Sequence, residues 1–317
     1  MRPRSLALLG ALLGASVLPI EAQAPEEIPA FGGEVSVGLV LVPVVVRSGD
    51  GYVRGLDAGD FRLLVDGQAT RFESFERRDD APISVVFLQD LSGSMEASGK
   101  LEASREAVRH FLDQATLADE FALATFAGPT TTVEVPFTGD LGALRESLAT
   151  WRAYGKTALH DAVSLLPEIS GSGSHAKRAA LLITDGADNA STIPPAEARE
   201  IVRRAQVPVY VLGLGSGSPY ELSREGAKAN RYADLLNLLA LYTAGRYFPV
   251  EGPDDLKEAL VAIAEDLRHQ YVLGFSTDGG GRPRHHRIQV EVPDRPVKVL
   301  ARQGYHGNLP SARRAGS

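Results

Sequence analysis

The chain has 317 residues, of which 44% are hydrophobic and 23% are charged, and its formal net charge at pH 7 is −7. These values are ordinary for a globular protein of one large domain or two smaller ones, and the acidic balance without a long basic run argues against nucleic acid as a partner. There is no cysteine, which excludes disulfides, thiolate metal sites and cysteine nucleophiles.

The N-terminus has the pattern of a secretory signal peptide. Arg2 and Arg4 precede the apolar stretch 5–17, which is too short to span a bilayer comfortably. Cleavage is expected after Ala24, with Ala22 as an alternative, and an uncleaved membrane anchor is the other interpretation. No later stretch is long and apolar enough to cross a membrane. We therefore expect a secreted or periplasmic protein with no membrane span after signal cleavage.

The next segment reads as a small all-β unit. Residues 25–33 have the composition of a flexible leader, and apolar residues then alternate through 35–46. A further strand is expected at 61–65, and Asp66-Gly67 supplies a hairpin turn into a strand at 70–75. This unit is too short to bury much apolar surface by itself.

From Pro82 onward, apolar runs of strand length alternate with amphipathic segments of helical period. The expected strands are 83–89, 120–126, 179–183, 207–212 and 246–250, with 131–137 as an antiparallel edge strand. The expected helices are 101–115, 141–151, 157–166, 195–205, 232–243 and 254–269. This alternation predicts an α/β fold of the doubly wound class, with a mainly parallel sheet and helices on both faces.

Strand patterns return at 271–275, 288–292 and 297–301. The economical arrangement is an α/β domain inserted into a small β-sandwich-like domain that both flanks build together. The expected segments are a signal peptide (1–24), a flexible leader (25–33), a β-rich flanking domain (34–80 plus 271–307), the α/β domain (81–270) and a disordered tail (308–317).

Oxygen-bearing side chains gather at three loops of the α/β region. Asp90, Ser92 and Ser94 follow the first buried strand two residues apart, so in an extended loop they point the same way. Thr157 precedes a helix, and Asp185 follows the strand 179–183. Ligands of open α/β sheets bind at the carboxyl ends of the strands. Two carboxylates and three hydroxyls could surround a hard cation such as Mg²⁺. If neutral hydroxyls are its direct ligands, much of its charge stays uncompensated and would attract an anionic group, such as a carboxylate of a partner.

These five residues resemble a known family motif. Asp90-Leu91-Ser92-Gly93-Ser94, together with Thr157 and Asp185, is similar to the metal-ion-dependent adhesion site of von Willebrand factor type A domains. The resemblance implies that Ser92 and Ser94 bind Mg²⁺ (or Mn²⁺) directly and that Thr157 does so in one state. It implies that Asp90 and Asp185 act directly or through water, and that an Asp or Glu carboxylate of an unknown partner protein completes the coordination.

The flanks resemble a bacterial group, the VWFA-related Acidobacterial domain proteins. The resemblance is carried by Val53-Arg54-Gly55-Leu56, by Val65-Asp66-Gly67 and by Gln270-Tyr271-Val272-Leu273-Gly274-Phe275. Ala244 departs from the glycine usual in that group. The resemblance implies an exported bacterial protein.

Three functions stay open at this stage. The first is cation-dependent protein binding without catalysis, in adhesion or in assembly of envelope complexes. The second is a metal-dependent hydrolase or phosphatase, although aspartyl phosphatases need a second acid where this chain has Ser92, and no Gly-x-Ser-x-Gly occurs. The third is a structural envelope protein whose site binds no metal, in which Asp90, Ser92 or Ser94 is a helix cap.

Other polar residues have simpler interpretations. Asp161 is expected to cap a helix or to support the site, and Asp188 and Asn189 are expected to be loop residues that at most contact it through water. A basic cluster is expected to form a solvated hairpin tip, and its members are Arg282, Arg284, His285, His286 and Arg287.

Overall fold

The computed structural model describes residues 38–49, 51–77, 79–186, 188–202, 207–215, 229–277 and 284–307. The expected signal peptide, leader and C-terminal tail lie outside the described residues. Among the described helices, none is both long enough and apolar enough to cross a membrane.

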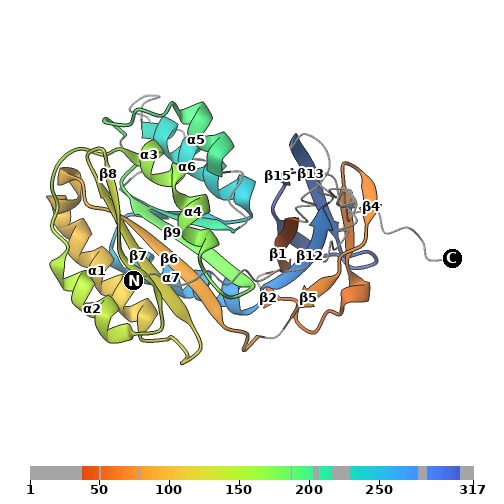
Figure 1. Ribbon diagram of the computed structural model, residues 1–317. Coiled ribbons are helices and arrows are strands. Elements are labelled where there is room, and N and C mark those ends of the chain that lie inside the picture. Colours follow the sequence, from red (N-terminus) through yellow and green to blue (C-terminus); the bar gives the residue numbers. More distant parts are fainter. Residues whose placement is uncertain are drawn as a thin grey trace, which may run out of the picture. The chain divides into compact units, whose positions relative to one another are not determined.

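A six-stranded sheet forms the centre of the α/β region, in the order β11-β10-β9-β6-β7-β8 (Figure 1). Its strands are β6 (Ile83–Asp90), β7 (Glu120–Ala127), β8 (Thr130–Thr138), β9 (Lys177–Thr184), β10 (Val209–Leu214) and β11 (Tyr247–Val250). All neighbours pair in parallel except β7 and β8, which pair antiparallel. The central strands are buried on both faces, as their unbroken apolar runs require. The predicted fold class is confirmed.

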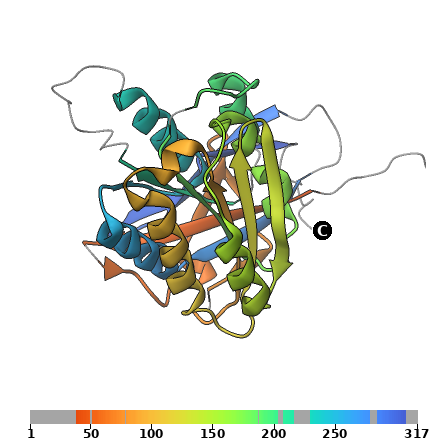
Figure 2. The same cartoon turned by 90° about the vertical axis from the view of Figure 1, so that its left-hand side faces the viewer.

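Helices cover both faces of this sheet (Figures 1 and 2). They are α1 (Lys100–Leu112), α2 (Leu141–Thr150), α3 (Leu159–Ser164), α4 (Leu166–Gly171), α5 (Pro195–Val202), α6 (Ala229–Thr243) and α7 (Pro253–Arg268). Buried side chains of α1, α2 and α7 share one core with one face of the sheet, whereas those of α3 to α6 share a second core with the other face. Since β6 lies between β7 and β9, the chain winds outward from β6 in both directions, and the switch point of the sheet lies between β6 and β9.

The single helix expected over 157–166 is wrong. The structure instead has α3 and α4, which meet at Leu165. Pro167 stands in the first turn of α4, where its missing N–H costs nothing, but its ring would clash with a carbonyl one turn earlier in a continuous helix. The first two residues of the expected helix, Thr157 and Ala158, lie in the loop before α3.

Two further sheets combine segments from both ends of the described chain. One has the order β14-β1-β12-β5 with β2 on β1, and the other has the order β15-β13-β3-β4. Their strands are β1 (Gly38–Ser48), β2 (Gly51–Tyr52), β3 (Arg62–Val65), β4 (Gln68–Thr70), β5 (Ser74–Glu76), β12 (Tyr271–Thr277), β13 (Arg284–Glu291), β14 (Lys298–Ala301) and β15 (Gly304–Gly307). Apolar side chains of both sheets form one core, in which Val42, Leu63 and Phe275 are buried. The two flanks therefore share a core, while the exact domain bounds stay a prediction.

Candidate metal site

The candidate site lies at the switch point of the central sheet. Asp90 is the last residue of β6, and Thr184 is the last residue of the neighbouring parallel strand β9. Because Gln89 pairs with Ile183 in the sheet register, Asp90 and Thr184 leave the sheet side by side. Thr184 Oγ1 donates a hydrogen bond of 2.7 Å to Asp90 Oδ2. Asp185 follows directly, so both acidic residues of the sequence motif stand at the same edge.

The first loop holds its oxygens through short local contacts. Asp90 Oδ1 accepts a hydrogen bond of 2.8 Å from the Ser92 backbone N–H, and Ser92 Oγ lies 3.2 Å from Ser94 Oγ. Asp90 and Ser92 are buried, whereas Ser94 is exposed. Met95 is fully buried below the loop and anchors it to the core. The three oxygens of this loop therefore run from the sheet edge outward to solvent.

Hydrogen bonds tie the second loop to the first. Gly93 N–H donates to the Gly155 carbonyl at 3.1 Å, and Tyr154 N–H donates to the Leu91 carbonyl at 2.7 Å. Gly155 has a φ of 71°, which a residue with a side chain rarely adopts, and buried Thr157 follows this turn two residues later.

The third loop in turn holds the second. Asn189 Oδ1 accepts from Thr157 N–H at 3.0 Å, and Asn189 N–H donates to the Thr157 carbonyl at 3.0 Å. Asp188 accepts from the His160 backbone N–H at 3.1 Å, and Asp161 accepts from the backbone N–H groups of Thr192 and Ile193. Asn189 thus holds the Thr157 loop, and Asp188 holds the first turn of α3, both through direct hydrogen bonds. Simple loop polarity was expected for these two residues, so their structural role is larger than predicted. Asp161 is a supporting acceptor, as expected.

The acidic side chains of the site influence one another. Burial raises the pKa of Asp90, and the nearby negative charge of Asp185 adds to this increase, while hydrogen bonds from Ser92 and Thr184 oppose it. Two carboxylates and three hydroxyls form a hard-oxygen set that suits Mg²⁺ or Mn²⁺. Among the described residues no group of three or more His, Cys, Asp or Glu side chains could hold a metal, so a metal here would depend on the hydroxyls. The types of donor present therefore fit a hard divalent cation.

Two residues contact the carboxylates of this site in a way that was not predicted from the sequence. Thr184 could have been found, because it precedes Asp185 at the end of a strand that pairs with the strand of Asp90. Lys100, whose Nζ lies 3.2 Å from Asp185 Oδ2, could not. The direction of its side chain depends on the irregular turn before α1, where Ser98 and Gly99 both have positive φ.

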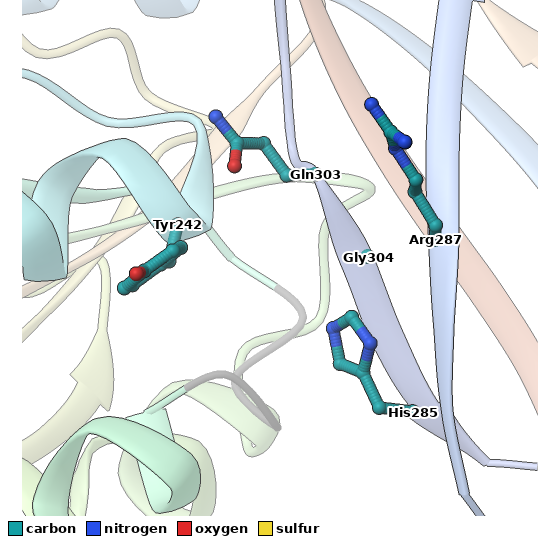
Figure 3. Close-up of a pocket in the computed structure, with 5 residues that line it drawn as sticks. All are labelled: Tyr242, His285, Arg287, Gln303 and Gly304. Carbon is teal, nitrogen blue, oxygen red and sulfur yellow. The ribbon is translucent and has the colours of Figure 1, made fainter. Parts of the chain in front are cut away.

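The basic cluster is solvated in part, as expected: Arg284, His285 and Arg287 are exposed on β13, and His286 is the exception. His286 is buried, stacks on Tyr305 and has its Nδ1 2.8 Å from Asp66 Oδ2. Neighbouring side chains line a separate cavity of about 360 Å³ (Figure 3), and its lining residues are Tyr242, His285, Arg287, Gln303 and Gly304. The alternation of β13 explains this exception, because it turns His286 inward. Arg282 lies outside the described residues.

Comparison with known proteins agrees with this architecture. Residues 85–187 match the family model of the von Willebrand factor type A domain, a range that includes all five candidate metal-site residues. A UPF0353 protein of Mycolicibacterium paratuberculosis is 26% identical over 208 residues, which is 60% of this chain and 62% of that protein. The inter-alpha-trypsin inhibitor heavy chain H3 of Bos taurus is 27% identical over 256 residues, which is 76% of this chain and 26% of that protein. The chain thus spans less than two thirds of the length of either relative.

A solved structure shows the same fold. The von Willebrand factor type A protein from Catenulispora acidiphila superposes with a TM-score of 0.51 at 14% identity, over 79% of this chain and 74% of that chain. Sheet order, flanking helices and the match to the domain model point to the same conclusion. Residues 85–187 are therefore a von Willebrand factor type A domain.

Proposed function

We propose that this protein binds a partner protein through one divalent cation, Mg²⁺ or Mn²⁺. The cation would be held by Asp90, Ser92, Ser94, Thr157 and Asp185, and when bound it would supply an electrophilic centre for an Asp or Glu carboxylate of the partner. The observation that carries the proposal is the set of hydrogen bonds that fixes three separate loops around one edge of the sheet.

The gradient of exposure across the site supports a ligand that arrives from outside. Asp90 is fully buried and Ser92 is 1% exposed, whereas Ser94 is open to solvent. Tyr154 lies in the loop bonded to Leu91 and is 57% exposed. Large exposed aromatic residues are frequent anchors of protein interfaces, because they bury much area for little conformational entropy. Tyr154 would therefore contact the partner beside the cation.

The environment of Asp90 favours binding over catalysis. A carboxylate nucleophile must expose an oxygen to the substrate, as in phosphatases that form an aspartyl phosphate. Asp90 is 0% exposed, and its two oxygens accept hydrogen bonds from Ser92 and Thr184. In this proposal Asp90 orients the loop and helps to hold the cation through its negative charge, directly or through water.

The place of action follows from the N-terminal sequence. The basic residues and short apolar stretch of 1–24 have the sequence pattern of a signal peptide, so the proposal includes export to the periplasm or the medium. Adhesion and assembly of envelope complexes are both compatible with such a location.

The test is an affinity capture from envelope extract with the purified chain, with Mg²⁺ and with EDTA. A partner that is retained with Mg²⁺, released by EDTA and lost with Ser92→Ala supports the proposal. Thr132→Ala, which removes an exposed hydroxyl from β8, is the matched control and should retain the partner. The same preparation is assayed against phosphatase and esterase substrates, and turnover that Asp90→Ala abolishes would contradict a binding-only function.

A further inference from the structure

A lysine stands beside the candidate cation site. Lys100 Nζ lies 3.2 Å from Asp185 Oδ2, and the two side chains are 26% and 8% exposed. Lys100 is the first residue of α1, and the preceding turn through Ser98 and Gly99 sets the direction in which its side chain leaves the helix. An ammonium group therefore already meets one of the two carboxylates that a cation would use.

The contact between Lys100 and Asp185 changes the net charge that an incoming cation meets. Without a cation, Asp90 and Asp185 carry two negative charges close together, and Lys100 compensates one of them. With a divalent cation bound, the cation and Lys100 together carry three positive charges against two negative ones. Because like charges at short range in a partly buried site repel strongly, Lys100 opposes entry of the cation and leaves the loaded site with an excess of positive charge.

The structure also offers a place for the displaced side chain. A cavity of about 190 Å³ lies next to Lys100. Its lining includes Glu251, together with the apolar side chains of Leu214, Val250 and Leu256. The aliphatic stem of a lysine packs well on such a wall while its ammonium stays near a carboxylate. Gly215 also lines this cavity next to Lys100.

We infer that Lys100 is a built-in competitor of the metal, which weakens cation binding and prepares the loaded site for an anionic partner. This inference rests on the proposed metal site and adds its regulation. A cation would bind stably only where its concentration is high or where a partner carboxylate supplies the missing negative charge. Cation and partner would then bind cooperatively.

Titration of the purified full chain with Mg²⁺ and with Mn²⁺, followed by calorimetry and by the shift in Tm, tests this inference. Lys100→Met is expected to bind Mg²⁺ about tenfold more tightly than the wild type and to have a lower Tm without metal. Lys100→Arg keeps the charge and should stay within about threefold of the wild type. Lys257→Met is the control for net charge, because Lys257 pairs with Glu106 at the surface of α7, and it should change the affinity less than twofold.

The outcomes separate the inference from the proposed function. Equal Mg²⁺ affinity of the wild type and Lys100→Met overturns the inference and leaves the proposed metal site standing. Binding by Lys100→Met alone supports the inference and overturns the proposed function, because Lys100 would then be the resident cation. Failure of both proteins to bind Mg²⁺ or Mn²⁺ overturns both.

Discussion

Thr184 Oγ1 donates a hydrogen bond of 2.7 Å to Oδ2 of Asp90, and this contact joins the ends of two adjacent parallel strands. The same Oγ1 accepts a hydrogen bond of 3.0 Å from Gly186 N–H, which shapes the loop that carries Asp185. The Thr184 hydroxyl thus donates a hydrogen bond to the buried carboxylate of Asp90 and also shapes the loop that carries Asp185. The candidate site is therefore built partly by a residue that need not touch the metal.

Thr184→Val should lower the free energy of unfolding by about 1–3 kcal/mol without metal, because it leaves an oxygen of buried Asp90 without this donor while keeping the side-chain volume. Urea denaturation in EDTA measures the loss. Thr125→Val is the control, since Thr125 Oγ1 donates to Glu134 on the edge strand β8, and the expected loss is under about 1 kcal/mol. Equal losses of unfolding free energy for Thr184→Val and Thr125→Val would contradict this prediction, because the hydrogen bond to Asp90 would then contribute no more than the bond to Glu134.

Asn189→Ala should weaken Mg²⁺ binding several-fold. Its Oδ1 accepts from Thr157 N–H at 3.0 Å, and without this acceptor the Thr157 loop loses one of its supports. Calorimetric titration gives the affinity, and the accompanying loss of stability should be about 1 kcal/mol. Asn189→Asp keeps the acceptor and should bind Mg²⁺ at least as tightly as the wild type. If Asn189→Ala bound Mg²⁺ as tightly as the wild type, Asn189 would have no role in supporting the metal site.

The sequence was sufficient for the features that depend on local pattern. The buried runs that end at Asp90 and Thr184 are typical of parallel strands. Because parallel strands bring their carboxyl ends to one edge, the sequence predicts that Asp90 and Asp185 lie at the same edge of the sheet, as they do. The break between α3 and α4 was missed, although Pro167 signals it. Lys100 could not be predicted, because its contact with Asp185 bridges 85 positions and depends on two positive-φ residues. Contacts of this kind require the assembled fold.

A buried lysine should make stability depend on pH. Burial lowers the pKa of Lys177 to about 8, with nearby Arg268 adding to the effect and the carboxylates of Asp79 and Glu76 opposing it. Between about pH 8 and the ordinary lysine pKa of about 10.4, the unfolded chain binds a proton that the folded protein does not, so stability rises with pH in this window. Relative to Lys177→Met, the wild type should gain about 1–2 kcal/mol between pH 7.5 and 9.5 in urea denaturation. Parallel pH profiles of the two proteins would contradict this account.

The buried ion pair of Asp119 and Arg268 should be essential for stability. Burial alone would raise the pKa of Asp119, but hydrogen bonds from Arg268 and from the backbone N–H groups of Thr116 and Ile83 lower it overall. The contribution of this carboxylate is therefore present above its unfolded pKa of about 3.9 and is lost as the pH falls through the lower folded value.

Asp119→Asn should accordingly cost about 3 kcal/mol at pH 7, because it leaves the Arg268 guanidinium without its carboxylate, and the cost should shrink toward pH 3. Denaturation at both pH values measures the effect. Asp113→Asn breaks an exposed pair with Arg145 and should cost less than about 1 kcal/mol. Similar losses of unfolding free energy for Asp119→Asn and Asp113→Asn would contradict this prediction, because burial would then not increase the contribution of the Asp119–Arg268 ion pair.

The central claim is that one divalent cation sits among the oxygens of Asp90, Ser92, Ser94, Thr157 and Asp185. The most direct measurement is an anomalous difference map from crystals of the full chain soaked in MnCl₂. The account predicts one strong peak within coordination distance of Ser92 Oγ and Ser94 Oγ, and its absence from crystals of Ser92→Ala. A map with no peak at this edge of the sheet, at a Mn²⁺ concentration that saturates any binding in solution, would contradict it.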